Sequence, residues 1–88
     1  MLDELESVAE NGQLVQAMVN TKGWKEVVKP ALESRVEACV RDISVAKEHG
    51  EFIAIQQAMN AINNLIDFIE VTLIDGKEAY KEIRNVKR

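Results

Sequence analysis

Apolar and polar residues alternate with a helical period through the second half of the chain. Apolar side chains recur at intervals of three and four residues, at Phe52, Ile55, Met59, Ile62, Ile66, Ile69 and Leu73. One apolar residue per turn on a single stripe is typical of a helix that packs lengthwise against another helix. The pattern therefore predicts a long helix over residues 51–75.

A second stripe with the same spacing precedes this helix. Its members are Leu32, Val36, Cys39, Ile43 and Ala46, and the opposite face carries the charged residues Glu33, Glu37, Arg41, Asp42, Lys47 and Glu48. We expect a helix that begins at residue 24 or 30 and ends at residue 49. His49 would cap its C-terminus, and Gly50 would adopt the left-handed conformation that often follows a helix. Glu51 would then open the next helix, where a carboxylate favours the positive end of the helix dipole.

Pro30 allows two interpretations of the segment around it. Proline inside a helix removes a hydrogen bond and clashes with the preceding turn, at a cost of ~3 kcal/mol, but it fits a first turn well. Either Trp24–Lys29 is a separate turn that leads into a helix starting at Pro30, or one helix from about Gly23 is kinked at Pro30.

A shorter helix is predicted at the N-terminus, over residues 2–19. One apolar face is formed by Leu2, Leu5, Val8 and Ala9, and the pattern resumes with Leu14, Val15, Met18 and Val19. Asn11-Gly12 between them is a turn or C-cap signal, so the helix either stops there or continues with a kink. Asp75-Gly76 is interpreted in the same way as the end of the long helix. Residues 77–88 then form a basic polar tail, either helical or frayed.

The short connection at His49-Gly50 makes the two long helices fold back on each other. The expected fold is all-α: an antiparallel αα-hairpin of two long helices with a short N-terminal helix, in a single domain over residues 1–76. A hairpin of this size buries one stripe per helix, which seldom stabilises a domain alone. We therefore expect the chain to oligomerise into a helical bundle.

The long helix lacks charge over most of its length. No charged residue occurs from Phe52 to Ile66, where glutamine and asparagine alternate with Ala54, Ala58 and Ala61. Uncharged polar residues beside alanine allow helices to approach closely without burying charge. The candidate interface residues are Gln56, Gln57, Asn60, Asn63, Asn64, Trp24, Leu65 and Phe68.

Composition limits the classes of function. The chain has 88 residues, of which 47% are hydrophobic and 30% charged, values ordinary for one folded domain. Its net charge of −4 is uneven, with an acidic N-terminal segment and a basic C-terminal one. One cysteine cannot form an internal disulfide and fits a reducing compartment. We expect no signal peptide, and no membrane span, since a span needs about 20 apolar residues. The expected location is the cytoplasm of a host cell or a virion.

The sequence predicts no enzyme. The only histidine, His49, lies at a predicted helix end, and Cys39 lies on the apolar stripe as a small buried residue. Glu33 and Glu37 are one turn apart, but Arg41 follows at the next turn, which is typical of surface ion pairs. No nucleotide-binding loop, metal-binding spacing or nucleophile elbow occurs. We expect no catalytic residue, no cofactor and no metal.

Nucleic-acid binding is expected only weakly, through the C-terminal segment. Between Glu51 and Gly76 there is no Lys or Arg, so the long helix lacks the cations that hold a groove-binding helix against phosphates. The positive charges lie beyond it, at Lys77, Lys81, Arg84, Lys87 and Arg88.

One segment resembles small helical proteins encoded by tailed bacteriophages, often near head-morphogenesis genes. The similarity covers residues 23–70 and is carried by Gly23-Trp24 before a long charged helix, followed by the run Gln56-Gln57-Ala58-Met59-Asn60-Ala61-Ile62. Such sequences often have glycine after the glutamine and proline after the final helix, where this chain has Gln57 or Ala58 and Ile74-Asp75. The resemblance implies a virion or assembly component and transfers no catalytic residue.

Two hypotheses of function follow from these observations. The first is a non-enzymatic oligomeric helical protein, a phage virion structural or assembly accessory component, whose partners are further copies of itself and another phage or host protein. The second is a small adaptor or inhibitor that binds a host or phage enzyme through the same helical surface.

Overall fold

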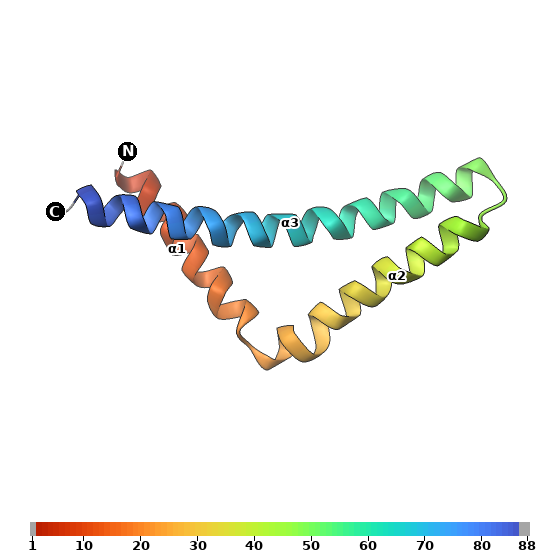
Figure 1. Ribbon diagram of the computed structural model, residues 1–88, viewed down its shortest axis with the longest axis horizontal. Coiled ribbons are helices and arrows are strands. Elements are labelled where there is room, and N and C mark those ends of the chain that lie inside the picture. The colour runs from red at the N-terminus through yellow and green to blue at the C-terminus, as the bar shows by residue number, and fades with distance from the viewer. Residues whose placement is uncertain (1, 87–88) are drawn as a thin grey trace. The chain divides into compact units, whose positions relative to one another are not determined.

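A computed structural model describes residues 2–86 of the chain, and they form helices and short connections without a strand (Figure 1). The helices are α1 (Leu2–Val19), the π-helical turn η1 (Gly23–Val28), α2 (Lys29–Val45) and α3 (His49–Val86). The all-α prediction is confirmed, and α1 has the predicted bounds. Lys87 and Arg88, predicted as the end of the basic tail, lie outside the described residues.

The chain divides into two compact units. Unit 1 comprises residues 1–21 and 67–88, and unit 2 comprises residues 22–66. Helix α3 contributes its first part to unit 2 and its last part to unit 1.

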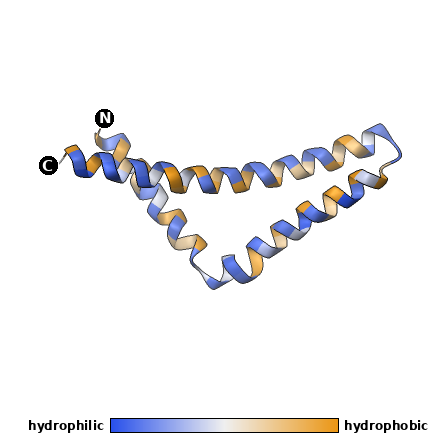
Figure 2. Ribbon diagram, in the orientation of Figure 1, coloured by the Kyte–Doolittle hydropathy of each residue, from blue (hydrophilic) through white to orange (hydrophobic). Residues whose placement is uncertain are grey.

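Within unit 2, α2 and the first part of α3 run in opposite directions on either side of residues 46–48 (Figure 1). Orange apolar residues recur along both helices in Figure 2. Within unit 2, every residue of the two predicted stripes is half-buried except Phe52. Trp24 and Ala38 are the other half-buried residues of this unit. Phe52 is 37% exposed. The three/four spacing therefore identified the inward side of each helix.

Pro30 is accommodated without a break in the helix. Lys22 and Lys29, which flank η1, both have right-handed helical backbone angles, and the Lys29 N–H donates to the Trp24 carbonyl five residues earlier. In a regular α-helix the proline ring would clash with the carbonyl four residues earlier. The wider π turn relieves this clash. Of the two interpretations, the structure has one continuous helical path through Pro30.

The turn between α2 and α3 differs from the prediction. Helix α2 ends at Val45, where Ala46 is extended and its N–H donates to the Ile43 carbonyl. His49 is the first residue of α3, so it does not cap the preceding helix. Gly50 is also helical, and no described glycine has a positive φ. The prediction of a His49-Gly50 C-cap is therefore wrong: the extended residue that ends α2 lies three positions earlier. Glu51 lies in the first turn of α3 as predicted.

Helix α3 does not end at Asp75-Gly76. It continues to Val86, and residues 77–86 belong to unit 1. Ala79 and Ile83 are buried there with Ala9 of α1, and Leu5 packs against this cluster. The interpretation of residues 77–88 as a tail is wrong for its described part, because this segment supplies Ala79 and Ile83 to the buried cluster that includes Ala9 of α1.

Helix α1 likewise continues through Asn11-Gly12. It ends at Val19, where the Thr21 hydroxyl and N–H both donate to the Met18 carbonyl, at 2.7 and 3.0 Å. The residues of α1 least exposed to solvent are Leu5, Ala9, Gly12, Val15, Gln16 and Val19. Gly12 is thus part of the packed face of α1 and not its end.

Candidate functional site

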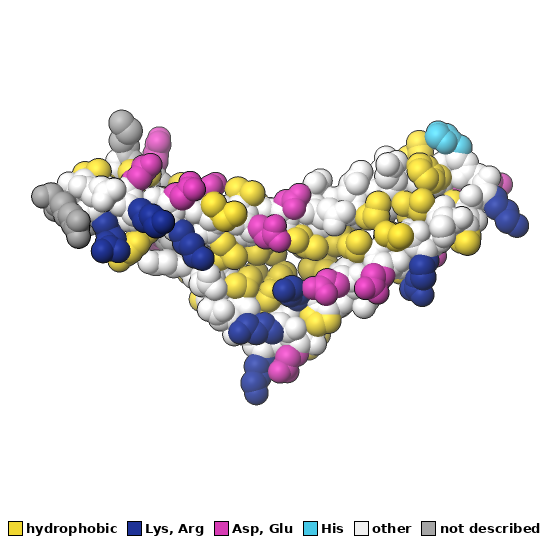
Figure 3. Space-filling model, in the orientation of Figure 1, with side chains coloured by type: hydrophobic (Ala, Val, Ile, Leu, Met, Phe, Trp, Pro, Cys, Tyr) yellow, Lys and Arg dark blue, Asp and Glu magenta, His cyan; other side chains and the backbone are white. Residues whose placement is uncertain are grey.

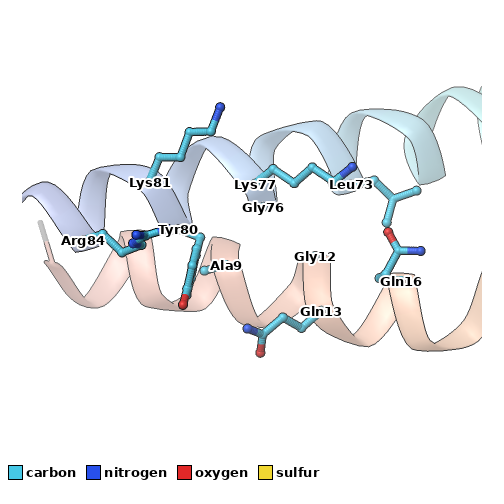
Figure 4. A pocket seen from close by; sticks show the side chains of 10 residues that line it. All are labelled: Ala9, Gly12, Gln13, Gln16, Leu73, Gly76, Lys77, Tyr80, Lys81 and Arg84. Carbon is cyan, nitrogen blue, oxygen red and sulfur yellow. The ribbon is translucent and has the colours of Figure 1, made fainter.

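The packing of unit 1 is centred on two glycines that face each other, Gly12 of α1 and Gly76 of α3 (Figure 4). A Cβ atom added to Gly12 would lie 2.8 Å from the Cα of Gly76 and 3.3 Å from the carbonyl oxygen of Thr72. Real Cβ atoms essentially never lie closer than 3.0 Å to another heavy atom, so the 2.8 Å approach excludes a side chain at this position. The helices can approach this closely only because both residues lack a side chain.

A groove of about 360 Å³ opens beside this crossing, within unit 1. It is lined from α1 by Ala9, Gly12, Gln13 and Gln16, and from α3 by Leu73, Gly76, Lys77, Tyr80, Lys81 and Arg84. Figure 4 shows Tyr80 pointing from α3 toward α1, with Arg84 beside it. The Arg84 guanidinium carbon lies 5.9 Å from the centre of the Tyr80 ring, within the range of a cation–π contact.

The lining of the groove is positively charged. Lys77, Lys81 and Arg84 are exposed, and no acidic residue is among the lining residues. Lys and Arg side chains gather over this C-terminal part of α3 in Figure 3. Their intervals of four and three place the three cations along one line of the helix. Gln13 and Gln16 line the groove from α1, and the Gln16 amide nitrogen donates to the side-chain oxygen of Asn20 at 3.3 Å. The charge of the groove therefore comes from α3 alone and suits an extended anionic group.

A second surface lies in unit 2, on the first part of α3. Ala54, Ala58, Ala61 and Leu65 are exposed and follow one another at intervals of four, three and four. This spacing places them on one stripe, separate from the half-buried stripe that begins at Ile55. Leu65 is 46% exposed. The stripe has the form of a helix-packing seam, but no part of unit 2 covers it.

The amide residues predicted as interface candidates are all exposed: Gln56, Gln57, Asn60, Asn63 and Asn64. Helical spacing separates them into two lines. Gln57 and Asn64 lie beside the alanine stripe, whereas Gln56, Asn60 and Asn63 lie on the far side of the helix. The structure therefore brings Gln57 and Asn64 together with Leu65 and leaves the other amides apart from them.

The two aromatic candidates differ in position: Trp24 belongs to η1, whereas Phe68 follows Leu65 at an interval of three on α3. Trp24 is half-buried in η1, and its carbonyl accepts a hydrogen bond from Lys29. Phe68 is 64% exposed and belongs to unit 1. Trp24 is therefore not on the alanine stripe, and Phe68 continues its spacing into unit 1.

Cys39 and His49 are the remaining side chains of chemical interest. Cys39 is half-buried on the α2 stripe, and His49 is exposed. Within residues 2–86, no group of three or more His, Cys, Asp or Glu side chains could hold a metal ion. In the same part of the chain, no helix is sufficiently long and apolar to cross a membrane.

Sequence reasoning missed the groove. The basic residues Lys77, Lys81 and Arg84 were recognised, but they were predicted to lie on a polar tail. The missing signal was the pair Gly12 and Gly76: each lies on an otherwise regular helical pattern, and together they allow the helices to cross. Glycine inside an amphipathic pattern is therefore a packing signal as well as an end signal.

No family model matches the chain, and no curated protein or solved structure matches it.

Proposed function

We propose that this chain is a non-enzymatic, self-associating helical protein that serves as a structural or assembly accessory component of a bacteriophage virion. It would act in the cytoplasm of the host cell or in the virion itself. Self-association is supported chiefly by the low burial of unit 2. This unit has two apolar stripes and an uncharged helix face, yet none of its residues 22–66 is buried.

The small number of buried residues supports this proposal. The buried apolar residues of the described chain are Ala9, Ile69, Ala79 and Ile83, all in unit 1. In unit 2 the stripe residues are only half covered, and large apolar side chains such as Ile53 and Leu65 are 38% and 46% exposed. Burial of apolar surface is the main favourable term in folding and association, worth about 25 cal/mol per Å². A second copy packed on the exposed stripe would supply the burial that unit 2 lacks.

The chemistry of the stripe favours another helix as the occupant. The side chains of Ala54, Ala58 and Ala61 are short, so the backbone of a facing helix can approach closely. Leu65 adds a larger apolar side chain that a partner helix can bury. No charged residue between Phe52 and Ile66 would have to be desolvated. The phage assignment rests on the resemblance of residues 23–70 and on the run from Gln56 to Ile62 within it.

Disulfide trapping tests the stripe directly. Cys39→Ser removes the single native thiol, and Ala61→Cys then places one thiol on the stripe. We expect a disulfide-linked dimer on a non-reducing gel after mild oxidation. The matched control is Asp42→Cys in the same background, on the exposed charged face of α2. If both thiols cross-link equally, or if neither does, the stripe is not the self-association surface.

The adaptor or inhibitor hypothesis uses the same stripe with a different occupant. Photo-cross-linking from position 61 in infected cells separates the two hypotheses. Cross-links to further copies of the chain or to capsid and connector proteins support a virion role. Cross-links to one host or phage enzyme would replace it with the adaptor hypothesis.

A further inference from the structure

Unit 1 carries two lines of opposite charge with matching spacing. One is the basic line of the groove, formed by Lys77, Lys81 and Arg84 on α3. The other is an acidic line on α1, formed by Asp3, Glu6 and Glu10, all exposed. We propose that the basic groove of one protomer binds the acidic line of α1 from a second copy, which gives a symmetric contact between two copies of unit 1.

The spacing of the charges fits an antiparallel arrangement. Along α1 the acidic residues are separated by three and then four positions, and along α3 the basic residues by four and then three. Antiparallel helices therefore pair Glu10 with Lys77, Glu6 with Lys81 and Asp3 with Arg84 at equal intervals along both axes. At 1.5 Å per residue, both lines extend over about 10 Å.

The acidic line is free to meet another molecule. The side of α1 that packs in unit 1 contains Leu5, Ala9 and Gly12. Helical geometry at 100° per residue places Asp3, Glu6 and Glu10 on another side of the helix. None of them lines the groove of its own protomer. The contact is thus reciprocal: each protomer offers a basic groove and an acidic helix, as a two-fold axis requires.

The groove favours a helix over a small anion. Its cations are spread along α3, and Figure 4 shows Lys81 pointing away from α1 while Lys77 extends along its own helix. Side chains that do not converge on one point suit a line of carboxylates better than a single phosphate. Tyr80, which is 50% exposed, points toward α1 and offers an apolar ring beside Arg84.

This contact is independent of the alanine stripe, because it uses unit 1 alone. The test is therefore made in the Ala61→Glu background, which disables the stripe. Variant A reverses the acidic line, with Asp3→Lys, Glu6→Lys and Glu10→Lys. Variant B reverses the basic line, with Lys77→Glu, Lys81→Glu and Arg84→Glu.

Sedimentation at about 20 mM salt measures the association. We expect the background chain to dimerise and variants A and B each to associate about tenfold more weakly or worse. An equimolar mixture of A and B should recover the dimer, since each supplies the charge that the other has lost. Raising the salt to about 0.5 M should dissociate both the background dimer and the mixed dimer, because screening then acts within about 5 Å.

Lys22→Glu, Lys25→Glu and Lys29→Glu form the control for variant B. These exposed residues of unit 2 have intervals of three and four, and their reversal changes the net charge equally. The control should associate as the background does. Circular dichroism of every variant checks that the helices remain folded.

Two results would overturn the proposal. One is a mixture of folded A and B that stays monomeric. The other is unchanged self-association in variant B together with loss of binding to a short DNA duplex that the background chain binds. That second result would assign the groove to phosphates of nucleic acid.

Discussion

The backbones of Gly12 and Gly76 are in direct contact, and the Cα of each occupies the space where the other would carry a side chain. This contact brings α1 onto the last part of α3 and aligns Ala9 with the buried pair Ala79 and Ile83. It also creates the groove that the basic residues of α3 line. The two glycines therefore allow the close crossing at which both the buried cluster and the groove of unit 1 lie.

Gly12→Ala should destabilise the protein by about 1–3 kcal/mol. Alanine is the better helix former by about 1 kcal/mol, but its Cβ would meet the backbone of Gly76 at 2.8 Å, which no rotamer change can relieve. Gly50→Ala is the matched control, since a Cβ at Gly50 has no neighbour within 4 Å. That control should be neutral or stabilising by up to ~1 kcal/mol in urea unfolding followed by circular dichroism. Equal effects of the two substitutions would refute the close crossing.

Ile83→Ala tests whether the C-terminal segment belongs to the core. Ile83 is 9% exposed, so its truncation should cost ~2–3 kcal/mol, whereas Val86→Ala, at a site 66% exposed, should change stability by less than ~0.5 kcal/mol. Deletion of residues 77–88 should consequently release α1 and lower the helix content. A truncated protein with full helicity in α1, measured by amide hydrogen exchange, would show that the segment is a tail after all.

Pro30→Ala should stabilise unit 2 by ~1–2 kcal/mol. The substitution introduces a strong helix former and removes the ring that the π turn accommodates, which stabilises the folded state. It also removes the restraint that proline places on the unfolded chain, but this destabilising effect is smaller. The Lys29 N–H should then move from the Trp24 carbonyl to a regular α-helical partner, detectable in amide chemical shifts. A lower melting temperature for Pro30→Ala would mean that the π turn has another cause.

Ile62→Asp tests the inward stripe of α3. Ile62 is half-buried, and a carboxylate at that position loses apolar burial and enters a poorly solvated site. The loss should be about 2 kcal/mol, a substantial part of a total stability of ~5–15 kcal/mol. Its exposed neighbour provides the control Asn63→Asp, which introduces the same side chain at little cost. Similar melting temperatures for the two variants would place the stripe on the wrong side of the helix.

The helices and their inward sides could be predicted from the sequence because three/four spacing records which side of a helix meets apolar neighbours. Ile55, Ile62 and Ile66 are half-buried for this reason. The ends of the helices could not be predicted from Gly12, Gly50 and Gly76. Glycine is common after a helix, but it also occurs where two backbones touch, and only the partner residue distinguishes the two cases. The groove lies beside the contact between Gly12 and Gly76, so it could not be predicted before that contact was known.

The molar mass in solution tests the central claim, self-association through the alanine stripe of α3, most directly. Light scattering coupled to size-exclusion chromatography should be run at about 0.15 M salt and tens of micromolar protein. The account predicts a mass above the 9.9 kDa of one chain, and a marked fall toward that value for Ala61→Glu. The same exchange at an exposed site of α2, Ala31→Glu, should leave the mass unchanged. A wild-type chain that elutes as a single species of 9.9 kDa would contradict the account.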